Sequence, residues 1–430
     1  MSTIKENINA YAKDINEASE DERIRTAITR AIASYRKNLA EALERYPHTP
    51  ALAKEVQEIK KNAHQNWREL MAQAMDSIER NHGHAYFAKD AQEVVDIINE
   101  IAGGEKTIVK GKSMLGEEIH LRQRLADCGH EVWETDLGEF ILQLMDGRPM
   151  HILSPSIHVP REQVAEVFSD FFGREIPPEI SDEVMAVREF LREKYFTADI
   201  GISGANAVAA DTGQITIIEN EGNVRLCTAA PPVHIAVVGI EKIVPSFLDS
   251  MKVAEVNWRY GQYTAPAYVN IISGPSKTGD IEKVTTYGAH GPHDFHVIFV
   301  DNGRSKMIDD PVCHDAALCL RCGGCMYECP VFSLVAGHFG KAYMNGIGAI
   351  WTAFVDDTKE AAPIVYNCLR CGRCVEQCPM DIDVPTMIYH LRTQAVAQAD
   401  ADAKKYDLLS RVRLPAKMEG ALFQVSAAKK

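Results

Sequence analysis

The chain carries the stretch Cys319-Leu-Arg-Cys322-Gly-Gly-Cys325-Met-Tyr-Glu-Cys329-Pro330 and repeats its spacing in Cys368-Leu-Arg-Cys371-Gly-Arg-Cys374-Val-Glu-Gln-Cys378-Pro379. Both runs follow C-x2-C-x2-C-x3-C-P, a pattern that holds 4Fe–4S clusters. In two-cluster ferredoxins the fourth cysteine of each run ligates the other cluster. We therefore assign Cys319, Cys322, Cys325 and Cys378 to a first cluster, and Cys368, Cys371, Cys374 and Cys329 to a second.

Zinc and disulfides are the alternative uses of so many cysteines. Structural zinc usually takes two separated C-x2-C pairs, whereas each run here holds four cysteines. Disulfides need an oxidising compartment, and the polar start MSTIKENINA does not resemble a secretory signal. The pattern therefore predicts two 4Fe–4S clusters. Three cysteines remain without an assigned role, Cys128, Cys227 and Cys313, and the apolar neighbours of Cys227 favour a small core residue over a redox group.

Composition limits the class of protein. A chain of 430 residues with 46% hydrophobic and 25% charged residues is typical of a soluble protein of two or three domains. A formal charge of −14 argues against general nucleic-acid binding and against docking on anionic lipid by charge alone. No apolar run reaches the roughly eighteen residues of a membrane span. We expect a cytoplasmic protein, and leave open a peripheral attachment to the inner membrane through a partner.

The pattern of apolar residues divides the chain into four regions. Residues 1–104 are predicted to be a helical region that leads into the next domain, with helices near 24–43, 51–80 and 90–102. Short strands and helices alternate over 105–305, which indicates an α/β domain with a largely parallel sheet. Residues 306–395 form the dicluster domain, expected to be all-α, and 396–430 form a tail. The strands expected in the α/β domain lie at 106–110, 130–134, 151–154, 214–219, 234–238 and 296–300, and the helices at 114–128, 161–171 and 181–194.

Gly111-Lys112-Ser113 resembles the end of a phosphate-binding loop, but Lys106 stands where that motif requires its first glycine. We therefore exclude a P-loop. Lys112 and Ser113 nevertheless lie between a predicted strand and a predicted helix, where free N–H groups commonly bind anions. Simple capping of the helix by Ser113 explains the pattern equally well.

Glu219-Asn220-Glu221-Gly222-Asn223 follows a predicted strand. It is either a polar turn or a carboxylate presented at a strand end, where α/β proteins form ligand sites. The chain has no GxGxxG sequence, so a Rossmann dinucleotide site has no support. His158 is a lone histidine in a predicted loop, and such a residue is more often structural.

Several segments together resemble the lactate-utilisation (LUD) domain: Lys112-Ser-Met114 with Glu117-Glu118-Ile119, Glu134-Thr-Asp136-Leu-Gly-Glu139 with Gln143, Pro155-Ser-Ile-His158, Gly201–Asn206, Asn220–Asn223, Thr278–Glu282, Gly288–Pro292 and Asp301-Asn-Gly-Arg304. With the cysteine runs behind them, the chain resembles the LutB/LldF iron–sulfur proteins of bacterial lactate oxidation. The resemblance implies a NagB/RpiA/CoA-transferase-like fold for the LUD domain. It also implies Glu221 as a catalytic residue and Lys112, Ser113, His158 and Asn223 as ligand-binding residues.

The resemblance further implies a function: an electron-transfer subunit of an oxidoreductase complex that converts L-lactate to pyruvate. The implied partners are a cysteine-rich subunit similar to heterodisulfide reductase and a stand-alone LUD protein. Many family members carry serine where this chain has Cys368, and this difference motivates an alternative. In that alternative the chain is an electron-transfer adaptor of another redox complex, and its LUD domain binds a partner or ligand.

Overall fold

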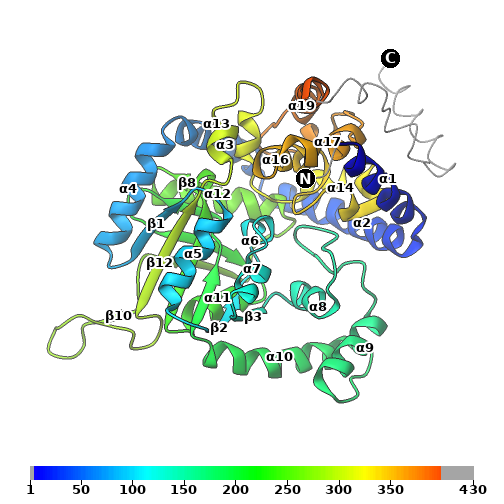
Figure 1. Ribbon diagram of the computed structural model, residues 1–430. Helices are drawn as coiled ribbons and strands as arrows, with labels where there is room; N and C mark the ends of the chain where they lie inside the picture. Colours follow the sequence, from blue (N-terminus) through cyan, green and yellow to red (C-terminus); the bar gives the residue numbers. More distant parts are fainter. Residues whose placement is uncertain (1–3, 399–430) are drawn as a thin grey trace.

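The computed structural model describes residues 4–398, which form an N-terminal helical region, an α/β domain and a C-terminal helical domain (Figure 1). The predicted tail of 396–430 therefore lies almost wholly outside the described residues. None of the helices in the described part of the chain is both long enough and apolar enough to cross a membrane.

A six-stranded parallel sheet forms the centre of the α/β domain, in the order β1-β12-β7-β4-β2-β3. Its strands are β1 (His84–Ala88), β2 (Thr107–Lys110), β3 (Glu131–Glu134), β4 (Ile200–Ser203), β7 (Val233–Gly239) and β12 (Asp294–Val300). The predicted parallel sheet is thus present, and β2, β3, β7 and β12 coincide closely with four of the expected strands.

Two parts of the sheet differ from the sequence-based expectation. Strand β1 lies inside the region expected to be helical and pairs with the distant β12, a long-range pairing that no local pattern encodes. The strand expected at 151–154 is absent, because this segment turns onto the C-terminal domain instead of joining the sheet. There the ring of His151 stacks on Tyr327, with centroids 4.7 Å apart. Strand β4 was not expected.

Alternating side chains of the strands build a core on each face of the sheet. On one face, Ile235 and Ile298 pack beneath α5 (Ala91–Ala102), α6 (Met114–Glu118) and α7 (Leu121–Asp127). On the other face, Val238 and Phe299 pack against α4 (Trp67–Arg80) and a second sheet, ordered β8-β5-β6-β9. Nearer β2, Val109 packs on this same face against α8 (Leu137–Met145), α9 (Arg161–Phe172) and α10 (Ile180–Thr197).

The remaining elements of this domain complete the layer of the second sheet. That sheet contains β5 (Ala207–Ala209), β6 (Ile215–Glu219), β8 (Ile243–Val244) and β9 (Tyr268–Ile272), and β10 (Lys277–Thr278) pairs separately with β11 (Thr286–Tyr287). Helices α11 (Asn223–Ala229) and α12 (Phe247–Tyr260) connect strands of the two sheets, and α13 (Arg304–Ile308) follows the last strand, β12.

The C-terminal domain is helical, as expected from its sequence, and contains α14 (Gly324–Tyr327), α15 (Phe332–Val335), α16 (Asn345–Val355), α17 (Thr358–Asn367), α18 (Arg373–Glu376) and α19 (Val384–Gln398). The first three helices of the chain are α1 (Ile4–Glu20), α2 (Glu22–Arg45) and α3 (Thr49–Gln65). They share one apolar core with this domain, in which Ile24 and Ile28 pack with Phe332 and Met326. In Figure 1 the blue α1 and α2 accordingly lie beside the orange helices.

Candidate metal centre and the adjoining cavity

The first cysteine run curls around a cavity. Arg321 and Gly323 adopt left-handed backbone conformations, with φ of 65° and 79°, and these turn the chain between Cys319 and α14. The cysteines that line this cavity are Cys319, Cys322, Cys325, Cys374 and Cys378.

The second run repeats the local geometry of the first. Arg370 and Gly372 adopt the same left-handed conformations, with φ of 53° and 83°, ahead of α18. The cysteines lining the second cavity are Cys329, Cys368, Cys371 and Cys374. The structure therefore places the fourth cysteine of each run beside the three leading cysteines of the other, and Cys374 borders both cavities.

The chemistry of these sulfurs fits a cationic iron–sulfur core. Burial raises the pKa of Cys322 and of Cys329 to about 12 and that of Cys378 to about 11, so an uncompensated thiolate is unfavourable here. Sulfur atoms also accept hydrogen bonds, among them one of 3.2 Å from Asn345 Nδ2 to Cys325 Sγ. Within residues 4–398, no three His, Cys, Asp or Glu side chains converge as single-ion ligands. Cysteines that line a cavity without converging on a point suit a multi-iron cluster better than zinc.

A larger cavity of about 300 Å³ lies between the α/β domain and the first cysteine run. Five neighbouring parallel strands end at it, and each contributes residues from the loop after its carboxyl end, as ligand sites of open α/β sheets do. These residues are Asp136 after β3, Lys112 and Ser113 after β2, Gly204–Asn206 after β4, Glu241 and Lys242 after β7, and Arg304 after β12.

Four of the five candidate residues of the LUD domain meet at this cavity: Lys112, Ser113, Glu221 and Asn223. Ser113 also caps α6, since its Oγ accepts a hydrogen bond of 3.4 Å from Gly116 N. His158 does not line the cavity. It lies near the N-terminal helices and the C-terminal domain, and burial and the nearby His338 lower its pKa.

Glu221 occupies an acidic part of the cavity. One of its carboxylate oxygens accepts a hydrogen bond of 3.3 Å from Leu137 N. Burial and the nearby Asp136 carboxylate raise the pKa of Glu221 to about 7. A carboxyl group with a pKa close to neutrality can take up and release a proton near physiological pH.

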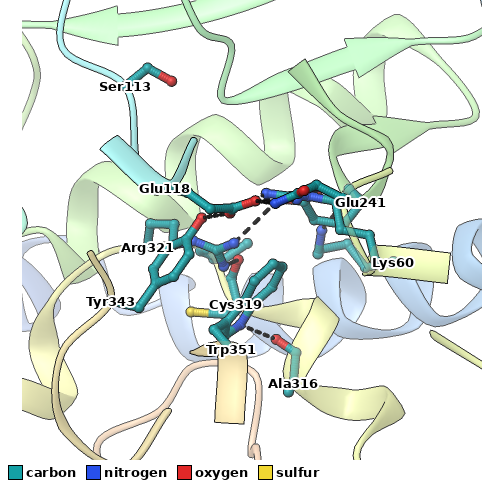
Figure 2. Close-up of polar contacts among 12 residues, drawn as sticks. Lys60, Ser113, Glu118, Glu241, Ala316, Cys319, Arg321, Tyr343 and Trp351 are labelled. Atoms are coloured by element: carbon teal, nitrogen blue, oxygen red, sulfur yellow. Dashed lines mark hydrogen bonds and ion pairs between the residues drawn. The ribbon is translucent and has the colours of Figure 1, made fainter. Parts of the chain in front are cut away.

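A buried ionic network at the cationic side of the cavity was not predicted from the sequence (Figure 2). The Arg304 guanidinium donates two hydrogen bonds of 2.8 Å to the two oxygens of Glu118 and one of 2.7 Å to Glu241. Arg321 donates to the other oxygen of Glu241 at 3.3 Å, and Tyr343 Oη donates to Glu118 at 2.6 Å. Burial alone would raise the pKa of Glu241, but the Arg304 and Arg321 guanidiniums lower it to about 2.

The network joins the two domains at the first cysteine run. Leu320 and Arg321 stand between Cys319 and Cys322, and both line the large cavity as well as the thiol cavity. The Arg321 guanidinium lies 3.8 Å from the ring centroid of Trp351, which covers its other side. A molecule in the large cavity would therefore be separated from the first cluster by little more than this loop.

Comparison with known proteins places the chain in a family. Residues 71–300 match the LUD domain, and residues 315–382 match the 4Fe–4S dicluster domain. Over 363 residues the chain is 36% identical to lactate utilization protein B of Bacillus subtilis (strain 168), an alignment that covers 82% of this chain and 73% of the relative. The chain belongs to the lactate utilization protein B family.

Other known proteins are also similar to the chain. Lactate utilization protein B of Shouchella clausii is 38% identical over 68% of this chain and 61% of its own length. The uncharacterized electron transport protein YkgF of Escherichia coli (strain K12) is 32% identical over 85% of this chain and 76% of the relative. A crystal structure of a DUF162 family protein from Deinococcus radiodurans matches with 14% identity and a TM-score of 0.32, covering 54% of this chain and 98% of that protein.

Proposed function

We propose that this chain is the iron–sulfur electron-transfer subunit of a complex that oxidises L-lactate to pyruvate. The observation that carries the proposal is the shared boundary of the large cavity and the first thiol cavity at Leu320 and Arg321. The names of the B. subtilis and S. clausii relatives supply the substrate.

The oxidation of lactate to pyruvate removes two electrons and two protons from the hydroxyl-bearing carbon and its oxygen. Two bound 4Fe–4S clusters would accept these electrons one at a time and pass them to a partner. Within the chain, Glu221 faces the large cavity with a pKa near 7, raised by burial and Asp136, and accepts the hydroxyl proton as a general base. The second proton leaves the carbon as the electrons are withdrawn, and it passes to water in the open cavity. Lys112, beside Glu139 at 3.6 Å, adds positive charge to the same cavity.

Electrons leave through the second cluster in this proposal. Cys374 borders both thiol cavities, so clusters held in them would lie close enough for one to pass electrons to the other. Arg370 and Arg373 of the second run are exposed, whereas Arg321 of the first run is almost fully buried. The second cluster is thus the one nearer a docking partner, for which we propose the heterodisulfide-reductase-like subunit. The stand-alone LUD protein completes the complex.

Anaerobic purification of the chain with its bound partners tests this function. L-Lactate should reduce the clusters of the purified complex, as followed by EPR, and deletion of the gene should prevent growth on lactate but not on pyruvate. If the clusters respond only to another donor, such as a ferredoxin or hydrogenase, and growth on lactate is normal without a duplicate gene, the adaptor role replaces the proposal.

A further inference from the structure

The large cavity contains two separate groups of charged residues. Glu221 interacts with Asp136, Lys112 and Glu219. Lys242 interacts instead with Arg321 and Glu241, and also with Cys319 and Arg304, on the side of the first cysteine run. The cavity is therefore acidic where α8 begins and cationic where it meets the thiol loop.

The cationic group has more positive than negative charges. Around Glu241 lie four cations, Arg304, Arg321, Lys242 and Lys60, and the nearby carboxylates are Glu241 itself and Glu118. Four positive charges against two negative ones leave an excess of two when all the groups are ionised. A buried excess of charge is costly unless an anion approaches it.

The other buried polar groups do not remove this excess. Glu118 and Glu241 both accept hydrogen bonds from Arg304, and Glu241 also accepts one from Arg321. These two carboxylates are therefore already included in the charge count. Lys60 donates a hydrogen bond of 2.8 Å to the Glu241 carbonyl, which is neutral. For Lys242, the described part of the chain supplies neither a hydrogen bond nor an ion pair, so its ammonium group has capacity for an anion.

The thiolates of the first cluster could balance some of these charges. The cations differ, however, in which cavity they line. Arg321 borders both the large cavity and the first thiol cavity. Lys242 borders the large cavity and is not part of the thiol cavity lining. Lys242 also interacts with the nearby Cys319 thiol, but its place in the cavity wall lets an anion in the large cavity reach its ammonium group.

We propose that the large cavity is a binding site for a small carboxylate anion, with Lys242 and Arg321 holding the carboxylate beside the first thiol loop. The acidic group around Glu221 is left to face the hydroxyl-bearing part of the molecule. This inference rests on the proposed function for its choice of ligand, and it adds which residues of this chain hold the carboxylate.

Direct binding to the isolated, anaerobically reconstituted full chain tests the site. In isothermal titration calorimetry, L-lactate and pyruvate should both bind, whereas 1,2-propanediol, which lacks the carboxylate, should not. Lys242→Met should weaken the binding of both acids about ten- to a hundredfold, the range expected when a charged hydrogen bond is lost. Lys277→Met, at an exposed lysine on β10, is the matched control and should leave binding unchanged.

Further measurements distinguish a loss of binding from a failure of a variant to fold or to hold its clusters. The absorbance of the clusters reports whether each variant is loaded, and Lys242→Arg, which keeps the charge, should restore binding to within a few-fold of the original. Absence of binding by either acid, or equal affinity in the Lys242→Met variant, would overturn the site. If lactate binds through Lys242 but does not reduce the clusters in the complex, the site stands and the proposed function fails. If lactate reduces them while Lys242→Met has no effect on affinity, the function stands and the site fails.

Discussion

Arg321, in the loop of the first cysteine run, donates a hydrogen bond of 3.3 Å to Glu241, which follows strand β7 of the LUD domain. The same loop residue covers the first thiol cavity and the large cavity. The Arg321 side chain therefore links a carboxylate of the LUD domain to the loop that surrounds the first cluster, and it places a positive charge beside that cluster. This contact is the basis of the first prediction.

Removing the charge of Arg321 should lower the reduction potential of the first cluster. Reduction adds negative charge, which a nearby guanidinium favours, so Arg321→Met should make the potential more negative by about 40–90 mV, the equivalent of about 1–2 kcal/mol for one electron. EPR-monitored redox titration measures this shift. Arg370→Met is the internal control, because Arg370 occupies the equivalent place in the second run and is exposed, where solvent screens its charge. Equal shifts in both variants would contradict the prediction.

The assignment of cluster ligands predicts a reciprocal pair of effects. Cys378→Ser should alter the EPR signal of the first cluster and leave that of the second intact, and Cys329→Ser should do the reverse, because each fourth cysteine lies beside the other run. Iron content and the two spectra measure the outcome. A Cys378→Ser protein in which only the second cluster changes would refute the exchange of ligands between runs.

Loss of Arg304 should destabilise the protein strongly. Its side chain is about 1% exposed, and Arg304→Met would leave the carboxylates of Glu118 and Glu241 buried without their main partner. Breaking a buried ion pair on one side costs about 3–5 kcal/mol. The midpoint of urea unfolding under anaerobic conditions measures the loss. Arg68→Met removes the exposed pair with Asp309 and should cost less than about 1 kcal/mol, so equal effects would contradict a structural role for the network.

The pH dependence of cluster reduction should depend on Glu221. Burial and Asp136 raise its pKa to about 7, so the carboxyl group is protonated and inactive as a base below that pH. The rate at which L-lactate reduces the clusters in the complex should therefore rise as pH increases through about 7. Glu221→Gln should lower this rate by about 10²–10⁴-fold and abolish the rise. A Glu221→Gln complex that retains the same pH profile would exclude Glu221 as the base.

The sequence predicted the parts of the fold that depend on local pattern. The cysteine spacing predicted that Cys378 lies with the first run and Cys329 with the second. In the structure, Cys378 lines the first thiol cavity and Cys329 the second. Short, mostly apolar runs located strands such as β7 and β12, each buried on both faces. Strand β1 was not predicted, because it pairs with β12, whose residues lie about two hundred positions further along the chain.

The candidate site was only partly predictable for the same reason. Lys112, Glu221 and Asn223 follow strand ends or turns that a local pattern reveals, and the structure brings them to one cavity. Glu118 and Arg304 lie in segments that carry the LUD resemblance, but nothing in either segment indicates that they bind each other. No local pattern indicates that Arg321 reaches Glu241, since that contact arises only when the two domains pack.

In the proposed function, an acid held at the large cavity delivers its electrons first to the adjacent first cluster. Freeze-quench EPR on the anaerobic complex mixed with L-lactate tests this order of electron transfer, with the Cys378→Ser protein used to identify which signal belongs to the first cluster. We expect the signal of the first cluster to appear before that of the second. If dithionite reduces both clusters but L-lactate reduces only the second, or reduces it first, the acid does not deliver its electrons to the first cluster.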